Sequence, residues 1–288
     1  MWTLGAARTP SPATVFWLGK TASGVMSSGV LCPSMGVLQA LQRTPGALKR
    51  APGLLVPQLI VFVLLLPQLL LQSAAPLLSS LVSLGVSGIF LVVTPFIQGG
   101  MFGMADEALR GRSSLSRFFA DGKSNYVQLL IAYVLLLVVN GVLGVVAVFA
   151  GVGALLGHDT TGLVLLAVVA VVGLLYLLVT FFVQFYGQAI VVDGESAIAA
   201  FARSYRVVRA NLLGTIGYLV VAVLVGGVAG GLYGGLSVLA TPEVAAYGLP
   251  ALSTPLLVVV GLLVAVVGSV VSAFSLTFSV GVYDEFTA

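Results

Sequence analysis

Long apolar runs alternate with short polar stretches along this chain from residue 54 onward. Six runs come near or exceed the ~20 residues that a helix needs to cross the hydrocarbon core of a bilayer. These runs are 54–72, 77–100, 126–156, 163–191, 212–240 and 255–282. Asn125 and Asn211 precede two of them as N-cap residue types, and Thr254 precedes a proline at a first helical position. The pattern predicts an all-α fold, a polytopic six-helix transmembrane bundle.

Three of the polar stretches carry apolar residues at the period of a helix. In 192–211, residues placed about 100° apart put apolar side chains on one side and arginines on the other. The apolar side holds Ile198, Phe201, Tyr205 and Val208. The stretch 36–52 has a similar pattern, and in 114–125 Asp121 is expected on the polar side, opposite Phe118. The sequence therefore predicts three short amphipathic helices at the membrane interface, one ahead of each membrane hairpin.

The composition agrees with a membrane protein. Hydrophobic residues make up 59% of the 288 positions and charged residues only 7%, against about 25% charged in soluble domains. Residues 1–34 are rich in Ser, Thr, Gly and Pro, and we expect a disordered segment there, followed by a membrane domain over 35–288. The single cysteine, Cys32, allows no internal disulfide, and no Cys or His cluster indicates a metal or cofactor site.

The distribution of positive charge predicts the topology. All twelve Lys and Arg residues lie in the N-terminal region, in the connection between the second and third runs, and in 203–209. By the positive-inside rule, both termini and the amphipathic helices are expected on the cytoplasmic side of the cell (plasma) membrane. The turns 73–76, 157–162 and 241–253 are then expected outside. The net charge of +3 is too small to indicate a nucleic-acid partner.

The three amphipathic stretches suggest an internal repeat. Each precedes a membrane hairpin, and each hairpin ends in acidic residues: Asp106, Glu107, Asp193, Glu195, Asp284 and Glu285. This order is typical of a threefold parallel repeat; alternatively, charges simply collect where helices leave the membrane. We expect the acidic residues to form ion pairs with a belt of arginines, namely Arg110, Arg203, Arg206 and Arg209.

One stretch also resembles a known motif. The pattern DG-x-SA-x-x-A-x-x-x-S-x-x-x-V-R-x-N is formed by Asp193, Gly194, Ser196, Ala197, Ala200, Ser204, Val208, Arg209 and Asn211. It resembles a motif of uncharacterised six-helix integral membrane proteins of prokaryotes, which are similar to the membrane domain found beside glycerophosphoryl diester phosphodiesterase domains. The resemblance covers roughly residues 35–283 and implies a fold and a membrane location. It implies no phosphodiesterase activity, because this chain has no such catalytic domain.

The predicted membrane helices contain amide and hydroxyl groups but no Asp, Glu, Lys, Arg or His. The absence of intramembrane charge argues against a proton-driven transporter. The polar groups are Gln58, Gln68, Gln98, Gln128, Asn140, Gln184, Gln188, Ser269, Ser272 and Ser275. We interpret them as bridges between helices; the alternative is a polar path for a substrate, lined by residues such as Gln98, Gln128, Asn140 and Gln184.

The fifth run carries two rows of glycines at four-residue spacing. One row is Gly226, Gly230 and Gly234, and the other is Gly227, Gly231 and Gly235. Such rows allow two helix backbones to approach closely. They predict helix packing inside the monomer, with the seam of a homo-oligomer as the alternative.

These observations favour a binding or organising role over catalysis, because no catalytic constellation occurs. We expect a non-enzymatic membrane organiser that binds lipids, anionic ones above all, or a protein partner of unspecified kind. The expected contacts with lipid headgroups or acidic partners are Arg203, Arg206, Arg209, Arg117 and Lys123. The alternative function is a permease or channel for a neutral or lipid-like solute.

Overall fold

The structure is a computed structural model that describes residues 33–74, 76–112, 114–157, 160–239 and 253–288. These residues form helices and short connections, and no strand occurs among them. Nearly all of the predicted disordered segment, 1–34, lies outside the described residues, as does most of the 241–253 turn.

Six long helices follow the six apolar runs. They are α3 (Leu55–Ala74), α4 (Pro76–Leu109), α6 (Tyr126–Leu156), α7 (Thr160–Val183), α10 (Leu212–Leu239) and α11 (Thr254–Thr287). Five stretches are long and apolar enough to cross a membrane alone, and a sixth crossing results if α2 and the start of α3, bent by 93°, count as one span. The predicted all-α membrane fold, with up to six spans, is confirmed.

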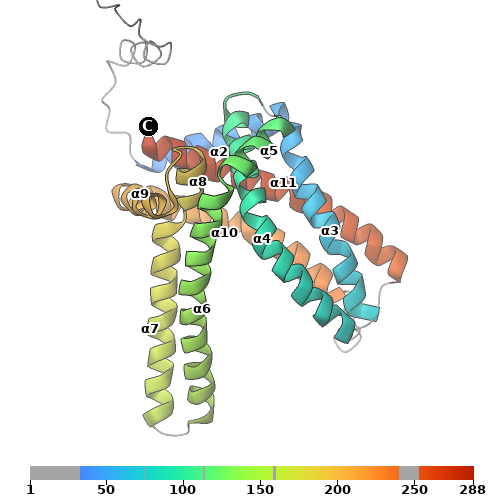
Figure 1. Ribbon diagram of the computed structural model, residues 1–288, viewed down its shortest axis with the longest axis vertical. Helices are drawn as coiled ribbons and strands as arrows, with labels where there is room; N and C mark the ends of the chain where they lie inside the picture. Colours follow the sequence, from blue (N-terminus) through green and yellow to red (C-terminus); the bar gives the residue numbers. More distant parts are fainter. Residues whose placement is uncertain (1–32, 75, 113, 158–159, 240–252) are drawn as a thin grey trace, which may run out of the picture. The chain divides into compact units, whose positions relative to one another are not determined.

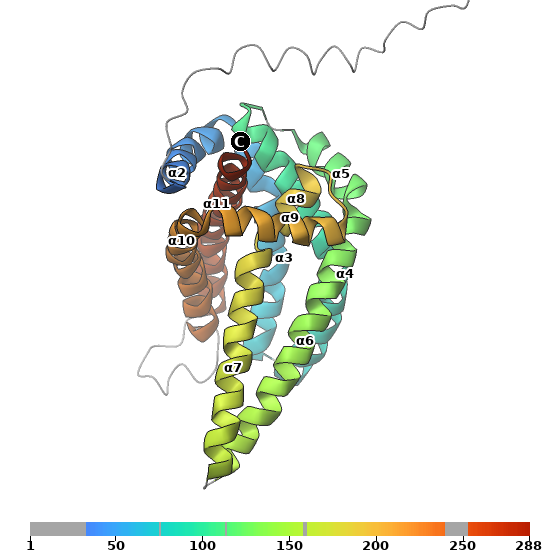
Figure 2. The ribbon, with the colours of Figure 1, turned by 90° about the vertical axis from the view of Figure 1, so that its left-hand side faces the viewer.

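A short helix precedes each hairpin of long helices. α2 (Pro33–Arg50) leads through a 3-10 turn, η1 (Pro52–Leu54), into α3 and α4. α5 (Leu115–Ser124) leads into α6 and α7, and α9 (Ala197–Ala210) leads into α10 and α11. A break after α7 adds the short α8 (Tyr186–Val191), and α9 then lies across the end of α7 (Figures 1 and 2). A threefold parallel repeat requires this order; the duplication itself stays a prediction.

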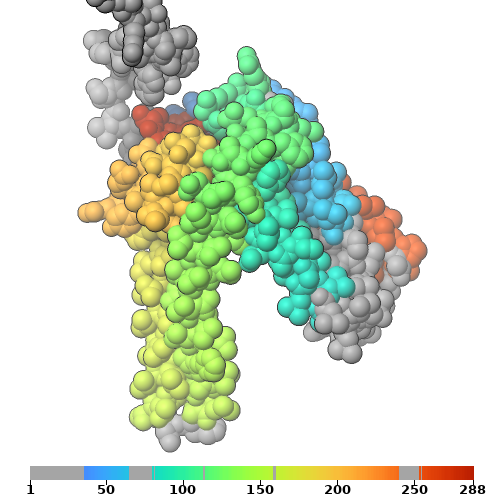
Figure 3. Space-filling model, in the orientation of Figure 1, coloured from blue at the N-terminus to red at the C-terminus, as the bar shows by residue number. Residues whose placement is uncertain are grey.

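The core lies where the short helices meet the last turns of α4, α8 and α11, which we call the charged end. α11 packs against α2, α3, α4 and α10. Tyr283 and Phe278 of α11, Phe185 before α8 and Met104 of α4 are fully buried. Away from this end, α6, α7 and α10 expose most of their apolar side chains, as helices do in lipid. In Figure 3 the hairpin of α6 and α7 projects from the charged end.

The glycine rows of α10 do not pack inside the monomer, so that prediction was wrong. All six glycines are exposed, and a Cβ atom added to any of them would meet no atom within 4 Å. α10 packs against α2 and α11, where Thr215 and Leu236 are buried and Tyr218 contacts the core, while the glycines of both rows stay uncovered. The alternative of an oligomer seam stays untested.

Two predicted helix caps act on the preceding helix instead. The side-chain amide of Asn125 donates to the carbonyl of Asp121 at 3.1 Å, and that of Asn211 donates to the carbonyl of Val207 at 3.1 Å. Each asparagine therefore closes the short helix before it, because the last carbonyls of a helix lack intrahelical donors. α11 does start at Thr254 with proline in its first turn, after Ser253.

Candidate functional site

The last turn of α4 reverses the chain and leads into a cavity lined by charged side chains. Gly111 has φ +87°, and its N–H donates to the carbonyl of Ala108 at 3.0 Å. The N–H of Arg112 donates to the carbonyl of Glu107 at 3.1 Å. These two bonds form a Schellman motif, whose left-handed residue favours glycine. The motif directs α5 back along α4.

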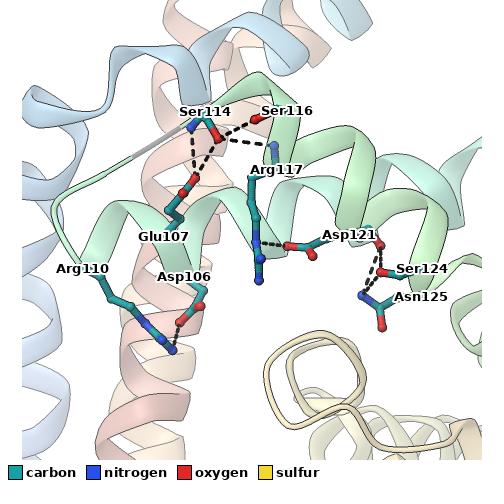
Figure 4. A network of polar contacts seen from close by, with 9 residues as sticks. All are labelled: Asp106, Glu107, Arg110, Ser114, Ser116, Arg117, Asp121, Ser124 and Asn125. Carbon is teal, nitrogen blue, oxygen red and sulfur yellow. Dashed lines mark hydrogen bonds and ion pairs between the residues drawn. The ribbon is translucent and has the colours of Figure 1, made fainter. Parts of the chain in front are cut away.

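Glu107 fixes the start of α5 against α4. Its Oε2 accepts hydrogen bonds from the backbone N–H of Ser114 at 3.0 Å and from the Ser114 hydroxyl at 3.2 Å. Oγ of Ser114 in turn accepts the N–H of Arg117 at 3.3 Å, as an N-cap does. Figure 4 shows this chain of contacts linking the two helices.

Two ion pairs flank this link, each with the carboxylate inside and the guanidinium outside. Nη2 of Arg110 lies 2.8 Å from Oδ1 of Asp106, and Nε of Arg117 lies 2.6 Å from Oδ2 of Asp121. The arginine side chains are 70% and 47% exposed, whereas the aspartate side chains are 12% and 11% exposed. The outer surface of both pairs is therefore positive.

These side chains and that of Arg112 border an open cavity of about 410 Å³, the arginine pocket, lined by Asp106, Glu107, Arg110, Arg112 and Arg117. Among the described residues, the exposed guanidinium of Arg112 has no side-chain partner. The ion pair of Arg117 uses Nε and leaves its terminal nitrogens available. Guanidinium groups in this arrangement can donate several hydrogen bonds to one phosphate or carboxylate.

Asp121 is buried, contrary to its expected place on the polar side of α5. α5 turns this residue toward Gly103 of α4. Burial raises the pKa of the Asp121 carboxyl above its ordinary value, and Arg117 opposes the shift while Asp106 and Glu107 add to it. The helical pattern missed this burial because the glycine of α4 leaves room for a polar side chain.

The predicted belt of ion pairs is confirmed in part. Nε of Arg203 donates to Oδ2 of Asp193 at 3.2 Å, and the Tyr283 hydroxyl donates to the same oxygen at 2.5 Å. These bonds join α9, the exit of α8 and α11. Nη1 of Arg43 lies 2.6 Å from Oε1 of Glu285, a pair that the sequence analysis missed. Its members are too far apart in sequence for any spacing rule to join them.

Arg206 and Arg209 do not join the belt, so that part of the prediction was wrong. Nε of Arg206 donates to the carbonyl of Ala202 at 3.3 Å. Within the described part of the chain, neither guanidinium forms an ion pair. α9 begins only at Ala197, so Asp193 lies before the helix, and Arg203 is the arginine of α9 that pairs with it. Both arginines are exposed on the surface of α9.

α5 and α9 share an exposed aromatic–basic pair. On α5, Phe119 is 62% exposed and precedes the exposed Lys123 by four residues. On α9, Tyr205 is 44% exposed and precedes Arg209 by four residues. Residues four apart lie on the same side of a helix. Each pair therefore presents a ring and a positive charge together, next to the start of a membrane helix.

Several polar groups predicted to bridge helices do so. Nε2 of Gln188 donates to Oγ of Ser279 at 3.1 Å, Oε1 of Gln128 accepts the N–H of Ala197 at 3.0 Å, and Nε2 of Gln58 donates to Sδ of Met101 at 3.1 Å. Ser269 bonds within its own helix, and the side chain of Gln68 lies outside the described residues. Both amide atoms of Gln184 are buried and have no hydrogen-bond partner in the part of the chain that the structure describes.

A comparison with protein families identifies the group of this chain. The model of one family, described as Domain of unknown function (DUF7847), matches residues 35–286. The chain belongs to this family. The DUF7847 region runs from α2 to the last turn of α11 and so contains the arginine pocket and both aromatic–basic pairs. No curated protein and no solved structure matches the chain, and the likeness to the phosphodiesterase-associated membrane domain has no support from these comparisons.

Proposed function

We propose that this DUF7847 protein is a non-enzymatic integral membrane protein that binds anionic, phosphate-bearing lipid headgroups at its charged end. By the positive-inside rule, the charged end and both termini face the cytoplasm, and the plasma membrane is the proposed location. The negative lipids of the cytoplasmic leaflet then lie against α5 and α9.

The observation that carries the proposal is the pair of matching surfaces, Phe119 with Lys123 and Tyr205 with Arg209. Aromatic rings settle at the level of the lipid headgroups, and a neighbouring Lys or Arg reaches the phosphate. Each positive charge near an anionic membrane surface contributes about 1 kcal/mol. The exposed rings favour a lipid over an acidic protein partner, because a ring that enters the membrane leaves the water.

The arginine pocket supports the same proposal. Its carboxylates are already engaged, Asp106 by Arg110 and Glu107 by Ser114. The guanidinium groups of Arg112 and Arg117 keep free donors for a phosphate. The pocket thus offers a second contact for a headgroup, beside the lipid-facing surface of α5.

Native mass spectrometry of the purified full-length chain tests the proposal. The chain is titrated with phosphatidylglycerol or phosphatidylcholine of identical acyl chains. We expect phosphatidylglycerol to bind in preference, with a dependence on ionic strength, because salt screens exposed charges. Equal binding of the two lipids at low salt would contradict the proposal.

A permease or channel for a neutral or lipid-like solute is the second candidate. The buried, unpartnered amide of Gln184 and Oε1 of Gln188 favour it, because a polar solute satisfies such groups. However, the cavity lined by Asn140 includes none of the other amides proposed for the path. Glycerol flux into proteoliposomes tests this candidate. It predicts a flux above that of empty vesicles which Gln184→Leu lowers, and rates equal to empty vesicles would contradict it.

A further inference from the structure

Asn140 is placed in the middle of the membrane helix α6 and faces outward. α6 spans Tyr126–Leu156, so about four turns of helix separate Asn140 from either end. Its side chain is exposed and has no hydrogen-bond partner among the described residues. Other membrane helices also contain side-chain amides. Wherever the structure describes these side chains, they are buried or half-buried.

An unpaired amide at this depth needs a partner. Water is absent from the hydrocarbon core, so a carboxamide exposed to lipid loses its hydrogen bonds without compensation. The helix hairpin supplies no partner, because the residues of α7 at this level are Val169, Val172, Gly173 and Tyr176, and the Tyr176 hydroxyl forms no hydrogen bond with it. The partner therefore has to come from outside the described fold.

The surface around Asn140 has room for another helix. Asn140 borders an open cavity of about 290 Å³ between α6 and α7. A Cβ atom added to Gly144 or Gly173, which also line it, would meet no atom within 4 Å. Small residues beside a polar one are typical of helix–helix contacts in membranes.

We propose that a second copy of this chain docks on this face, in a twofold dimer whose two Asn140 amides hydrogen bond to each other. A carboxamide has both donors and an acceptor and is therefore complementary to itself. In a twofold dimer each residue on the axis meets its own counterpart, so one amide per chain satisfies both copies. A different protein would need a hydrogen-bonding group of its own at the same depth.

The dimer contact is placed on α6 and not on the glycine rows of α10. Gly230 and its neighbours are exposed, but the polar side chains beside them on α10, Tyr233 and Ser237, carry hydroxyls, and α10 has no carboxamide that could pair with its own counterpart. Both copies insert with the same topology, so the two α6 helices run parallel, and Gly144, one turn after Asn140, also faces its counterpart. The absent side chain there permits close approach of the backbones.

Association of the full-length chain in nanodiscs or mild detergent tests the proposal, measured by energy transfer between labelled copies over a range of protein-to-lipid ratios. Asn140→Leu should weaken the dimer about tenfold, or about 1.4 kcal/mol, and Asn140→Gln should retain most of the affinity. Val142→Leu, on the opposite side of α6, is the matched control and should associate like wild type. A monomeric wild type, or unchanged association of Asn140→Leu, would overturn the proposal.

Cysteine crosslinking in native membranes gives a second measurement that does not depend on the stability of Asn140→Leu. In a Cys32→Ser background, Gly144→Cys should form an intermolecular disulfide on mild oxidation, and Gly231→Cys on α10 should not. Crosslinking at 231 without crosslinking at 144 would place the contact on α10 and overturn the proposal. Crosslinking of Gly144→Cys to a different protein would overturn it as well.

Discussion

The carboxylate of Asp121 on α5 lies directly against Gly103 on α4, and a methyl group added at Gly103 would overlap it. Gly100, one turn earlier, touches Phe118 in the same way. The contact between α4 and α5 beside the arginine pocket therefore depends on glycine, which has no side chain, at positions 100 and 103.

Because Gly103 lies against Asp121, we expect a larger side chain at position 103 to lower the stability of the fold. Gly103→Ala should lower the free energy of unfolding by about 1–3 kcal/mol, because the extra methyl group overpacks the contact. Gly230→Ala on α10 is the matched control, where the methyl group meets open space. It should be neutral or stabilising by up to about 1 kcal/mol. Unfolding of the full-length chain in detergent measures both, and equal effects would contradict the packing of α5 on α4.

We expect the Tyr283 hydroxyl to help hold α9 against α11. Its hydrogen bond to Asp193, which also accepts from Arg203 of α9, links α11 to α9 through the carboxylate of Asp193. Tyr283→Phe should cost about 1.5–3 kcal/mol, because the acceptor is charged, and should speed amide hydrogen exchange in α9. Tyr233→Phe, at an exposed position on α10, is the control. Unchanged exchange in α9 after Tyr283→Phe would show that the bond does not hold the helix.

Asp121 predicts a pH dependence of stability. Burial raises its pKa in the folded state above the ordinary value of 3.8. The folded state then binds the proton more tightly than the unfolded state, so this group's contribution to stability is present below 3.8 and is lost as pH rises through the folded-state pKa. Unfolding measured across the acidic range should show this slope in wild type and lose it in Asp121→Asn. A slope of opposite sign from this residue would contradict its burial.

The hydrophobic pattern was sufficient to predict the membrane helices and the three short helices, because both depend on the period of the chain itself. It was insufficient for contacts between hairpins. The pair of Arg43 and Glu285 depends on α2 packing against α11. The pattern also did not distinguish glycines at a close approach, such as Gly103, from the exposed glycines of α10, because both occur at helical spacing.

We expect Arg112 to contribute to lipid binding at the arginine pocket. Arg112→Gln should lower the binding of phosphatidylglycerol by about fivefold, since one charge near the surface is worth about 1 kcal/mol. It should leave stability unchanged, because this guanidinium has no partner in the described fold. Titration by native mass spectrometry, with thermal unfolding beside it, measures both. Binding equal to wild type would exclude the pocket from the lipid contact.

The most direct test of the proposed function removes the basic member of both aromatic–basic pairs. Lys123→Gln with Arg209→Gln is compared with Lys49→Gln plus Arg50→Gln, which removes the same charge from exposed positions of α2 that follow no aromatic residue by four. The account predicts that the first variant loses about 5- to 30-fold in phosphatidylglycerol binding, while the second stays near wild type. Equal losses in both variants would show that net charge alone attracts the lipid and would contradict the account.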